Sequence, residues 1–395
     1  MKHLFEETTP LTRVAAQQPV WGDPAQVRRV RAVLESRPPL VGLEDIRTLR
    51  LLLAKVAAGE AHVVQAGDCA EDPAECTAEH VWRKAAMLDV LAGTLKALTH
   101  RPVLRVGRIG GQMAKPRSQP FERVGDLELP VFRGHMVNDP APDPEGRIPD
   151  PLRLLTGYMA AIDVVNHLGW RPSTPTRDVP SVEPPVWTSH EALLLDYEEP
   201  MVREAENGER WLSSTHWPWI GERTRQVDGA HVELLAGVAN PIACKVGPGS
   251  SAEDVLDLCR RLDPLREPGR LTLIARMGAR NIADRLPALV ESVRAEGHPV
   301  IWLCDPMHGN SFTTPEGVKT RLIDDIAREI REFRIAVTAG GGVAGGLHLE
   351  ATPHPVSECV DEATTVDGSP ATYKTFCDPR LNLGQAAAVI SAWTD

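Results

Sequence analysis

The 395-residue sequence lacks the features that would mark several large classes of protein. No apolar run approaches the ~20 residues that a membrane-spanning helix requires, and residues 1–7 lack the apolar core of a signal peptide. We therefore expect a cytoplasmic protein with no membrane partner. The 43 Lys and Arg are outnumbered by 54 Asp and Glu, which gives a net charge of −11. Because a polyanion needs a basic face, this balance argues against a nucleic-acid partner but leaves room for a locally basic pocket.

The cysteines form no recognisable framework. They are odd in number and never occur as C-x-x-C, which excludes a disulfide scaffold and a zinc finger, although any single one can still be a ligand. Hydrophobic residues make up 42% and charged residues 25% of the chain, as in ordinary globular proteins, so it is neither disordered nor fibrous. The length allows two domains or one large barrel. The seven cysteines are at positions 69, 76, 244, 259, 304, 359 and 377.

Short apolar runs alternate with helical patterns along most of the chain. Residues 24–34 and 43–58 have apolar residues at helical spacing and predict an N-terminal helical extension over 1–60. Between the later strands the clearest helices are 252–262 and 282–296. Eight strands are expected, at 62–66, 103–106, 185–188, 214–217, 242–246, 271–276, 300–304 and 346–350.

This alternation predicts an α/β fold. Strands separated by helices form a parallel sheet, and eight such units over roughly 330 residues suit a (β/α)8 barrel, the TIM barrel, better than an open sheet. We therefore predict a catalytic barrel over 61–395 that follows the short helical extension. The stretch at about 121–176 breaks the rhythm and is rich in Pro, Asp and Arg, which indicates an insertion that includes one helix, 153–168.

Polar residues follow the expected strands at the point where each strand ends. A (β/α)8 barrel places these ends at one mouth, where active sites lie. Strand ends also carry polar residues simply because the chain is leaving the core, so each one alone is weak evidence, and only their convergence favours a site. The residues are Cys69, Arg108, Glu222, Arg223, Lys245, Arg276, His308 and Glu350.

Four of these residues are cations, which would repel one another at one mouth unless an anion joins them. Arginine forks match phosphate or carboxylate, and lysine adds a point charge. The ordinary alternative is a set of salt bridges to nearby carboxylates. A second basic segment, Lys115 to Ser118, suits a second phosphate, or else is an ordinary surface loop. The four cations are Arg108, Arg223, Lys245 and Arg276.

A third group consists of residue types that bind metals. Cys69, His308, Glu350 and Asp378 supply a thiolate, an imidazole and two carboxylates. They are far apart in sequence, so only the barrel can gather them. The alternatives are a buried apolar cysteine and a loop histidine. The mixed donors leave Mn, Co, Fe and Zn open, and with two phosphate-like sites they suggest chemistry between phosphorylated small molecules.

Several motifs resemble those of the type II (class II) 3-deoxy-D-arabino-heptulosonate 7-phosphate (DAHP) synthases. The resemblance runs from about Trp21 to Leu383. It implies a (β/α)8 barrel that joins phosphoenolpyruvate to erythrose 4-phosphate, the first step of the shikimate pathway, with release of phosphate. The matching segments are 65–71 (QAGDCAE), 107–112 (GRIGGQ), 115–118 (KPRS), 219–225 (WIGERTR), 276–278 (RMG), 304–310 (CDPMHGN) and 377–382 (CDPRLN).

The resemblance also implies a role for each matching residue. A divalent metal, Mn²⁺ or Co²⁺ first and Zn²⁺ or Fe²⁺ as alternatives, is expected on Cys69, His308, Glu350 and Asp378. The expected erythrose 4-phosphate contacts are Lys115, Arg117, Ser118 and Glu198. The expected catalytic residues are Cys69, Lys245, Glu222 and His308, with Glu222 orienting or activating water. The phosphoenolpyruvate site is expected to comprise Arg108, Glu222, Arg223, Lys245 and Arg276.

The sequence departs from the longer family members, which carry an N-terminal extension and extra helices that bind aromatic amino acids. It resembles the short subgroup associated with secondary metabolism, such as phenazine biosynthesis. We therefore expect weak or absent inhibition by aromatic amino acids, and a homodimer. We also hypothesise that Cys69 and Cys377 form an inactivating disulfide when the metal is absent.

Two alternative functions stay open at this point. The first is an aminoDAHP synthase that uses a nitrogen-bearing tetrose phosphate, because its motifs would be nearly the same. The second is a non-catalytic barrel that serves as a regulatory binding partner. Loss of a metal ligand or of a phosphate cation would favour the second alternative, and all of these residues are present.

Overall fold

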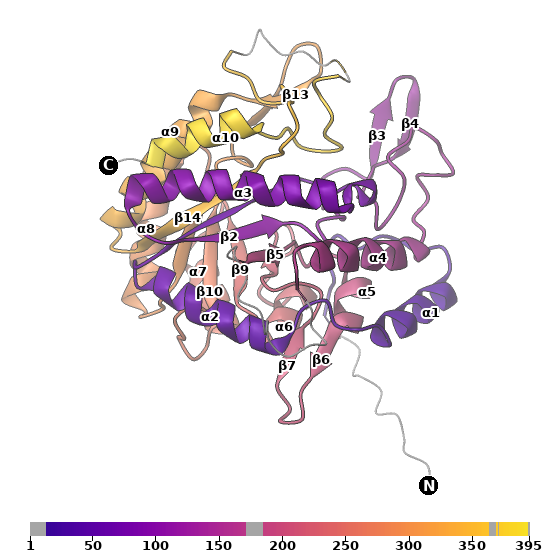
Figure 1. The fold of residues 1–395 in the computed structure, drawn as a ribbon, viewed down its shortest axis with the longest axis horizontal. Helices are drawn as coiled ribbons and strands as arrows, with labels where there is room; N and C mark the ends of the chain where they lie inside the picture. Colours follow the sequence, from indigo (N-terminus) through magenta and orange to yellow (C-terminus); the bar gives the residue numbers. More distant parts are fainter. Residues whose placement is uncertain (1–12, 171–184, 363–368, 370, 394–395) are drawn as a thin grey trace.

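The computed structural model describes residues 13–170, 185–362, 369 and 371–393, and its centre is one eight-stranded parallel sheet. The strand order is β5-β2-β1-β14-β11-β10-β9-β8. The two edges of this sheet meet, because Glu191 and Trp219 form a parallel bridge and the amide of Ala192 donates to the carbonyl of Trp219 at 3.0 Å. The sheet therefore closes, which confirms the predicted (β/α)8 barrel (Figure 1).

Seven of the eight barrel strands lie where the hydrophobic runs predicted them. Nearly all of their residues are buried, as expected for strands that are covered by helices outside and fill the barrel inside. The eight strands are β1 (His62–Gly67), β2 (Val103–Arg108), β5 (Val186–Ser189), β8 (Trp219–Ile220), β9 (Ile242–Val246), β10 (Leu271–Ala275), β11 (Ile301–Cys304) and β14 (Val343–Glu350).

The prediction of a strand at 214–217 is wrong, since the barrel strand in this region is β8. The segment before β8 is buried and runs beside β5, where the amide of Trp217 donates to the carbonyl of Thr188 at 3.1 Å. Pro218 then interrupts any ladder because it has no N–H to donate. Regular pairing with β9 begins only at Trp219. The hydrophobic pattern located the buried segment but not the residues that form the ladder.

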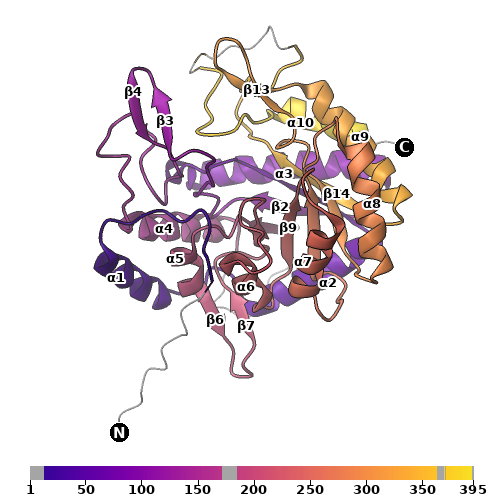
Figure 2. The same cartoon turned by 180° about the vertical axis from the view of Figure 1, so that it is seen from behind.

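The outer helices form because their apolar residues recur on one face. In α7 the residues that face the barrel include Val255, Leu258 and Leu262, and Ser251 caps the helix through reciprocal bonds with Asp254. Helices α7, α8 and α9 pack side by side around one wall (Figure 2). The helices after β1 are α3 (Ala78–Thr99), α4 (Leu152–His167), α5 (Leu195–Glu198), α6 (Ala230–Ala236), α7 (Ala252–Leu262), α8 (Ile282–Ala295), α9 (Ile323–Ala339) and α10 (Leu383–Ile390), with short 3₁₀ turns η1 (Pro73–Glu75), η2 (Glu199–Met201) and η4 (Ser391–Trp393).

Two helices precede the barrel, α1 (Pro24–Glu35) and α2 (Leu43–Ala57). The Asp23 side chain caps α1 by accepting from two backbone amides, and proline occupies the first turn. Helix α2 buries its apolar face against the start of β14, whereas α1 packs on α4. Residues 1–12 of the predicted extension lie outside the described residues. Within the described part of the chain, no helix is long and apolar enough to cross a membrane.

The stretch predicted as an insertion contains a hairpin of β3 (Phe121–Val124) and β4 (Leu127–Pro130), which projects from the barrel (Figure 1). Helix α4 follows it and packs on α3, so it takes the place of the barrel helix between β2 and β5. Residues 171–176 lie outside the described residues. Two smaller hairpins decorate other connections, β6 (Val202–Glu204) with β7 (Arg210–Leu212), and β12 (Ser311–Thr313) with β13 (Lys319–Arg321).

We predict that Gly346→Ala destabilises the barrel. Gly346 has φ +148°, and a Cβ there would overlap the carbonyl oxygen of Val63 on β1. Relief requires β1 and β14 to separate, so we expect a loss on the order of 3 kcal/mol in the free energy of unfolding. Urea unfolding measures this loss. As a control, Gly93→Ala on α3 meets nothing within 4 Å and is expected to change stability by less than about 1 kcal/mol. Equal effects of the two substitutions would contradict the prediction.

Candidate active site

Three adjacent strands end level with one another at the mouth of the barrel. Gly67 at the end of β1 pairs with Arg108 on β2 and with Glu350 on β14. The side chains of these two neighbours meet in front of the glycine, where Arg108 Nη2 donates to Glu350 Oε1 at 3.0 Å. Both side chains are almost fully buried. The register of the parallel sheet therefore brings together two residues that are 242 positions apart.

A cluster of metal-ligand donors surrounds Glu350. Donor atoms of His308, Glu350 and Asp378 all lie within 4.8 Å of one another. Asp305 holds His308 Nδ1 at 2.8 Å, which turns Nε2 toward the cluster, 3.2 Å from Glu350 Oε1. A carboxylate behind a histidine ligand is a common arrangement at metal sites. The donor set therefore fits a divalent cation.

Cys69 adjoins the same cluster, because its Sγ accepts from the backbone amide of Asp378 at 3.3 Å. Burial by itself raises the pKa of this thiol, but the hydrogen bond with Cys377 and the charge of Lys115 outweigh burial and lower the pKa to about 6. The thiolate is the form that binds a metal. The structure thus brings three of the residues predicted as metal ligands within 4.8 Å of one another and places Cys69 beside them.

Cations surround the cluster and keep its carboxylates ionised. Lys115 Nζ lies 3.4 Å from Asp378 Oδ2 and 3.7 Å from Glu350 Oε1, and Arg321 donates to Glu350 Oε2 at 2.8 Å. Burial opposes ionisation, yet His308, Lys115, Arg321 and Arg108 together hold the pKa of Glu350 well below its usual range. Lys115, predicted from the sequence to bind erythrose 4-phosphate, thus lies against the predicted metal ligands.

Two further cations of the predicted phosphoenolpyruvate site lie on β9 and after β10. Lys245 Nζ is 2.9 Å from Asp305 Oδ2, and burial lowers the pKa of this lysine. Arg276 Nη2 donates to the carbonyl of His308 at 2.8 Å. The Glu222 and Arg276 side chains both lie against Gly247, because a Cβ added there would be 3.1 Å from each of them. The buried Oε2 of Glu222 has no hydrogen-bond partner among the described residues, so it remains able to accept from water.

The second basic segment adjoins this site. Arg223 Nη2 donates to Ser118 Oγ at 2.6 Å, which joins a residue predicted for one substrate to a residue predicted for the other. Arg117 is held by Glu122 at 2.9 Å, and its Nη1 lies 3.5 Å from Cys377 Sγ. This hydrogen bond joins the two groups of cations, which we together call the cationic wall: Arg108, Arg223, Lys245 and Arg276 with Lys115 and Arg117.

Glu198 lies apart from these residues. Its buried carboxylate accepts from Ser214 Oγ at 2.6 Å and pairs with His190 Nε2 at 2.9 Å. The His190 ring packs so closely on Gly111 that a Cβ there would overlap it. Among the described residues, Glu198 is thus linked to the glycine loop through His190, and its predicted contact with erythrose 4-phosphate stays a prediction.

A carboxylate that sequence reasoning missed holds the glycine loop. Glu71 accepts from three consecutive backbone amides, those of Gly110, Gly111 and Gln112, at 2.7 to 3.0 Å. Successive amides that converge in this way form an anion-binding nest, and here a side chain fills it. The sequence signal was present in the segment 65–71, but nothing in that segment indicated which backbone atoms the glutamate binds.

Buried ion pairs also join the two segments that carry Cys69 and Asp378. Asp68 Oδ2 lies 2.8 Å from Lys84 Nζ, and Asp68 Oδ1 lies 2.6 Å from Arg380 Nη1. Burial raises the pKa of Asp68, but the charges of Lys84 and Arg380 outweigh it and lower the pKa to about 2. Asp68 thus ties the end of β1 to the loop that follows β14.

We predict that Asp68→Asn lowers the free energy of unfolding by about 2 to 3 kcal/mol at pH 7, because Lys84 and Arg380 lose the carboxylate that they share and keep only Glu75 and Glu358. The native pKa of Asp68 is depressed from its ordinary 3.8 to about 2. Its contribution is therefore complete above pH 4 and is lost as the pH falls toward 2. Urea unfolding of the metal-free wild type and variant at pH 7 and pH 3 measures the loss of stability and its dependence on pH.

Asp257→Asn is the matched control, because Asp257 pairs with Arg260 on the exposed face of α7. Exposed pairs contribute at most about 1 kcal/mol, so we expect little change at either pH. An Asp68→Asn deficit that is equally large at both pH values would contradict the assignment.

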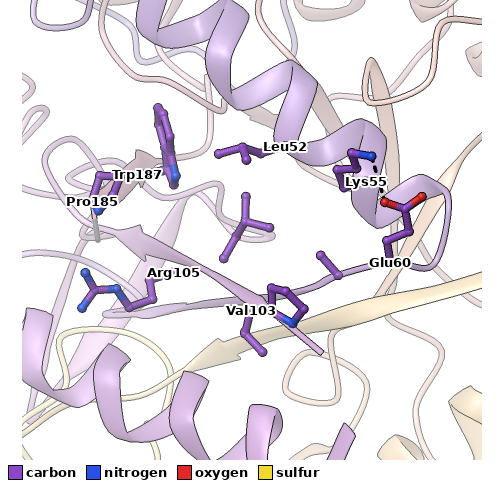
Figure 3. A pocket seen from close by; sticks show the side chains of 10 residues that line it. Leu52, Lys55, Glu60, Val103, Arg105, Pro185 and Trp187 are labelled. Carbon is purple, nitrogen blue, oxygen red and sulfur yellow. Dashed lines mark ion pairs between the residues drawn. The ribbon is translucent and has the colours of Figure 1, made fainter. Parts of the chain in front are cut away.

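A separate cavity of about 410 Å³ lies at the opposite end of the barrel. Figure 3 shows it between α2 and the starts of β2 and β5, with the Lys55–Glu60 ion pair at its edge. Its lining is mostly apolar and includes Leu52, Val103 and Trp187. None of the predicted site residues lines it, so it is distinct from the mouth.

The fold and the site define an enzyme of the (β/α)8 class whose mouth combines a group of cationic side chains with a set of side chains of metal-ligand type. The sequence matches the family model described as the class-II DAHP synthetase family over residues 7–183 and 173–392. This chain belongs to that family and is a transferase of the DAHP synthase type.

Three comparisons place the chain among known proteins. It is 56% identical over 379 residues to a probable phospho-2-dehydro-3-deoxyheptonate aldolase of Pseudomonas fluorescens, covering 96% of this chain and 94% of the relative. It is 40% identical over 419 positions to the phospho-2-dehydro-3-deoxyheptonate aldolase of Streptomyces coelicolor, covering 94% and 93%. A solved phospho-2-dehydro-3-deoxyheptonate aldolase from Francisella tularensis superposes with a TM-score of 0.57 at 15% identity over 92% of this chain and 97% of that chain, which shows the fold alone. These names do not favour the amino-tetrose or non-catalytic alternatives.

Proposed function

We propose that this protein condenses phosphoenolpyruvate with erythrose 4-phosphate and water, giving DAHP and inorganic phosphate, in a reaction that requires a divalent metal. The observation that carries the proposal is the convergence of Arg108, Lys245 and Arg276 with the donor cluster around Glu350 at one barrel mouth. Two phosphorylated substrates need the cations, and a carbonyl electrophile needs the metal. Mn²⁺ or Co²⁺ is the expected ion, on Cys69, His308, Glu350 and Asp378.

In this mechanism the cations bind and align the substrates. Arg108, Arg223, Lys245 and Arg276 hold the carboxylate and phosphate of phosphoenolpyruvate, and the segment from Lys115 to Ser118 holds the tetrose phosphate. When bound, the metal supplies Lewis-acid polarisation of the aldehyde oxygen. This alignment brings C3 of phosphoenolpyruvate onto the aldehyde carbon, and such positioning accounts for a large part of the rate.

Glu222 acts on the second half of the reaction. As the new carbon–carbon bond forms, C2 becomes electron-poor, and water adds there. The resulting hemiketal phosphate expels inorganic phosphate by C–O cleavage. The Oε1 atom of Glu222 accepts from Arg225, whereas its buried Oε2 has no hydrogen-bond partner among the described residues. This unpartnered oxygen supports the proposal that Glu222 accepts a proton from water close to the bound phosphoenolpyruvate.

The reaction is tested by the loss of the ultraviolet absorbance of phosphoenolpyruvate on mixing with erythrose 4-phosphate. We expect the loss with Mn²⁺ or Co²⁺, stoichiometric phosphate release, no loss with a chelator, and recovery when metal is added back. Activity that survives thorough chelation would refute metal dependence. No loss with any divalent metal would refute the condensation itself.

Glu222→Gln tests the water-activating role. We expect kcat to fall by roughly 10² to 10⁴, the range for loss of a general base, with little change in phosphoenolpyruvate binding measured by calorimetry. Glu253→Gln on the exposed face of α7 is the matched control and should leave kcat unchanged. Undiminished turnover of Glu222→Gln would refute the proposed water-activating role of Glu222.

We further infer that the protein is a short, cytoplasmic, homodimeric form that serves secondary metabolism. The alignments to the Streptomyces and Mycolicibacterium smegmatis relatives extend over 419 and 428 positions, more than the 395 residues of this chain, so those relatives carry residues that this chain lacks. This difference supports weak or absent inhibition by Phe, Tyr and Trp. Strong inhibition at micromolar concentrations of any of them, or a monomer in sedimentation analysis, would contradict this proposal.

A further inference from the structure

A buried histidine directly supports the cationic wall. His348 lies on β14, two residues before Glu350, and is fully buried. Its Nε2 is 2.8 Å from Arg108 Nη1, and its Nδ1 is 2.6 Å from Gln65 Oε1 on β1, the residue with which it is in register. The imidazole therefore bridges a proposed substrate-binding arginine and the polar interior of the barrel.

The hydrogen-bond chain beyond Gln65 has a fixed direction. At its far end the carbonyl of Trp217 can only accept, so the hydroxyl of Ser189 must donate to it. With that proton committed, Ser189 Oγ accepts from Gln65 Nε2 at 2.6 Å. This requirement orients the amide and turns its oxygen toward His348.

The other end of the chain is equally fixed. A guanidinium has only donors, so His348 Nε2 must offer a lone pair to Arg108. The Gln65 oxygen can only accept, so His348 Nδ1 must carry the proton. The two requirements agree on one state, the neutral imidazole protonated on Nδ1. This conclusion does not depend on which atom of the Gln65 amide is taken as the oxygen. At the two ends of the chain, the Trp217 carbonyl can only accept and the Arg108 guanidinium can only donate.

We propose that His348, held as the neutral Nδ1–H tautomer by Gln65 and Ser189, is a positioning residue that orients Arg108 for phosphoenolpyruvate. This inference rests on the proposed function. His348 holds Nη1 and Glu350 holds Nη2 at 3.0 Å, while the Trp219 ring lies 5.3 Å from the guanidinium carbon. An arginine fixed before binding loses less side-chain freedom when the anion arrives. A neutral ring also avoids a second positive charge beside Arg108.

The kinetic test is His348→Leu. We expect the KM for phosphoenolpyruvate to rise about tenfold or more, which corresponds to about 1.4 kcal/mol, with the KM for erythrose 4-phosphate unchanged and kcat within a few-fold. His62→Leu is the matched control, because His62 is also buried but lies at the start of β1, at the opposite end of the barrel from the mouth, where its ring packs on Trp393. We expect it to lower the melting temperature without changing either KM.

Ser189→Ala is a second, milder variant that breaks the chain at the third hydrogen bond from Arg108. It frees the Gln65 amide to rotate, so the KM for phosphoenolpyruvate should rise by a few-fold. A merely structural role would lower the stability of both variants without this selective effect. This variant keeps the inference testable if His348→Leu does not fold.

The tautomer is measured directly by nitrogen NMR on Zn²⁺-loaded full-length protein labelled with ¹⁵N-histidine. We expect the resonance pair of His348, identified as the pair that is absent from His348→Leu or that moves in Ser189→Ala, to show a protonated Nδ1 and an unprotonated Nε2. An Nε2–H tautomer or an imidazolium would overturn the inference. So would an unchanged phosphoenolpyruvate KM in His348→Leu. Wild-type protein that does not consume phosphoenolpyruvate would instead refute the proposed function and leave the tautomer result standing.

Discussion

The site depends on one buried carboxylate. Glu350 ends β14 inside the barrel, and its two oxygens contact Arg108, Arg321 and His308 with Lys115 close by. A lone buried carboxylate would be strongly destabilising, and so would the lone cations around it. Together they compensate one another, so each residue fixes the position of the others. Because Glu350 is also a proposed metal ligand, its charge positions both the proposed metal-ligand side chains and the cationic wall.

Two further buried carboxylates fix the positions of the charged side chains at the mouth. Asp68 links the segment of Cys69 to that of Asp378 through Arg380, and Asp305 fixes both His308 and Lys245. Each of these supporting carboxylates is buried and paired with at least one cation. Bound substrates and metal would change the net charge of the mouth, and supports with fixed partners limit how far the side chains move in response. Preorganisation of this kind is the main source of electrostatic catalysis.

Sequence reasoning predicted the barrel and the residues at its strand ends because both follow from local patterns. Hydrophobic runs mark buried strands, and a parallel barrel places all strand ends at one mouth. It missed side chains whose role depends on partners remote in sequence. Arg321 belongs to a small hairpin, so no strand-end rule points to it. His348 faces inward within a strand, where a histidine resembles any other core residue. Glu198 follows a barrel strand as the site residues do, yet its carboxylate pairs with His190 and Ser214 inside the barrel.

The polar interior shows why such residues are hard to recognise. Beneath the mouth, the side chains of β1, β5 and β14 form a continuous chain from the Trp217 carbonyl to Arg108. Replacing its members with apolar residues of similar volume could maintain or improve stability, so the chain is better explained by geometry than by folding energy. It transmits a fixed hydrogen-bond direction from a backbone carbonyl to the guanidinium of Arg108. If Arg108 binds phosphoenolpyruvate as proposed, the barrel core contributes to function at positions that no ligand touches.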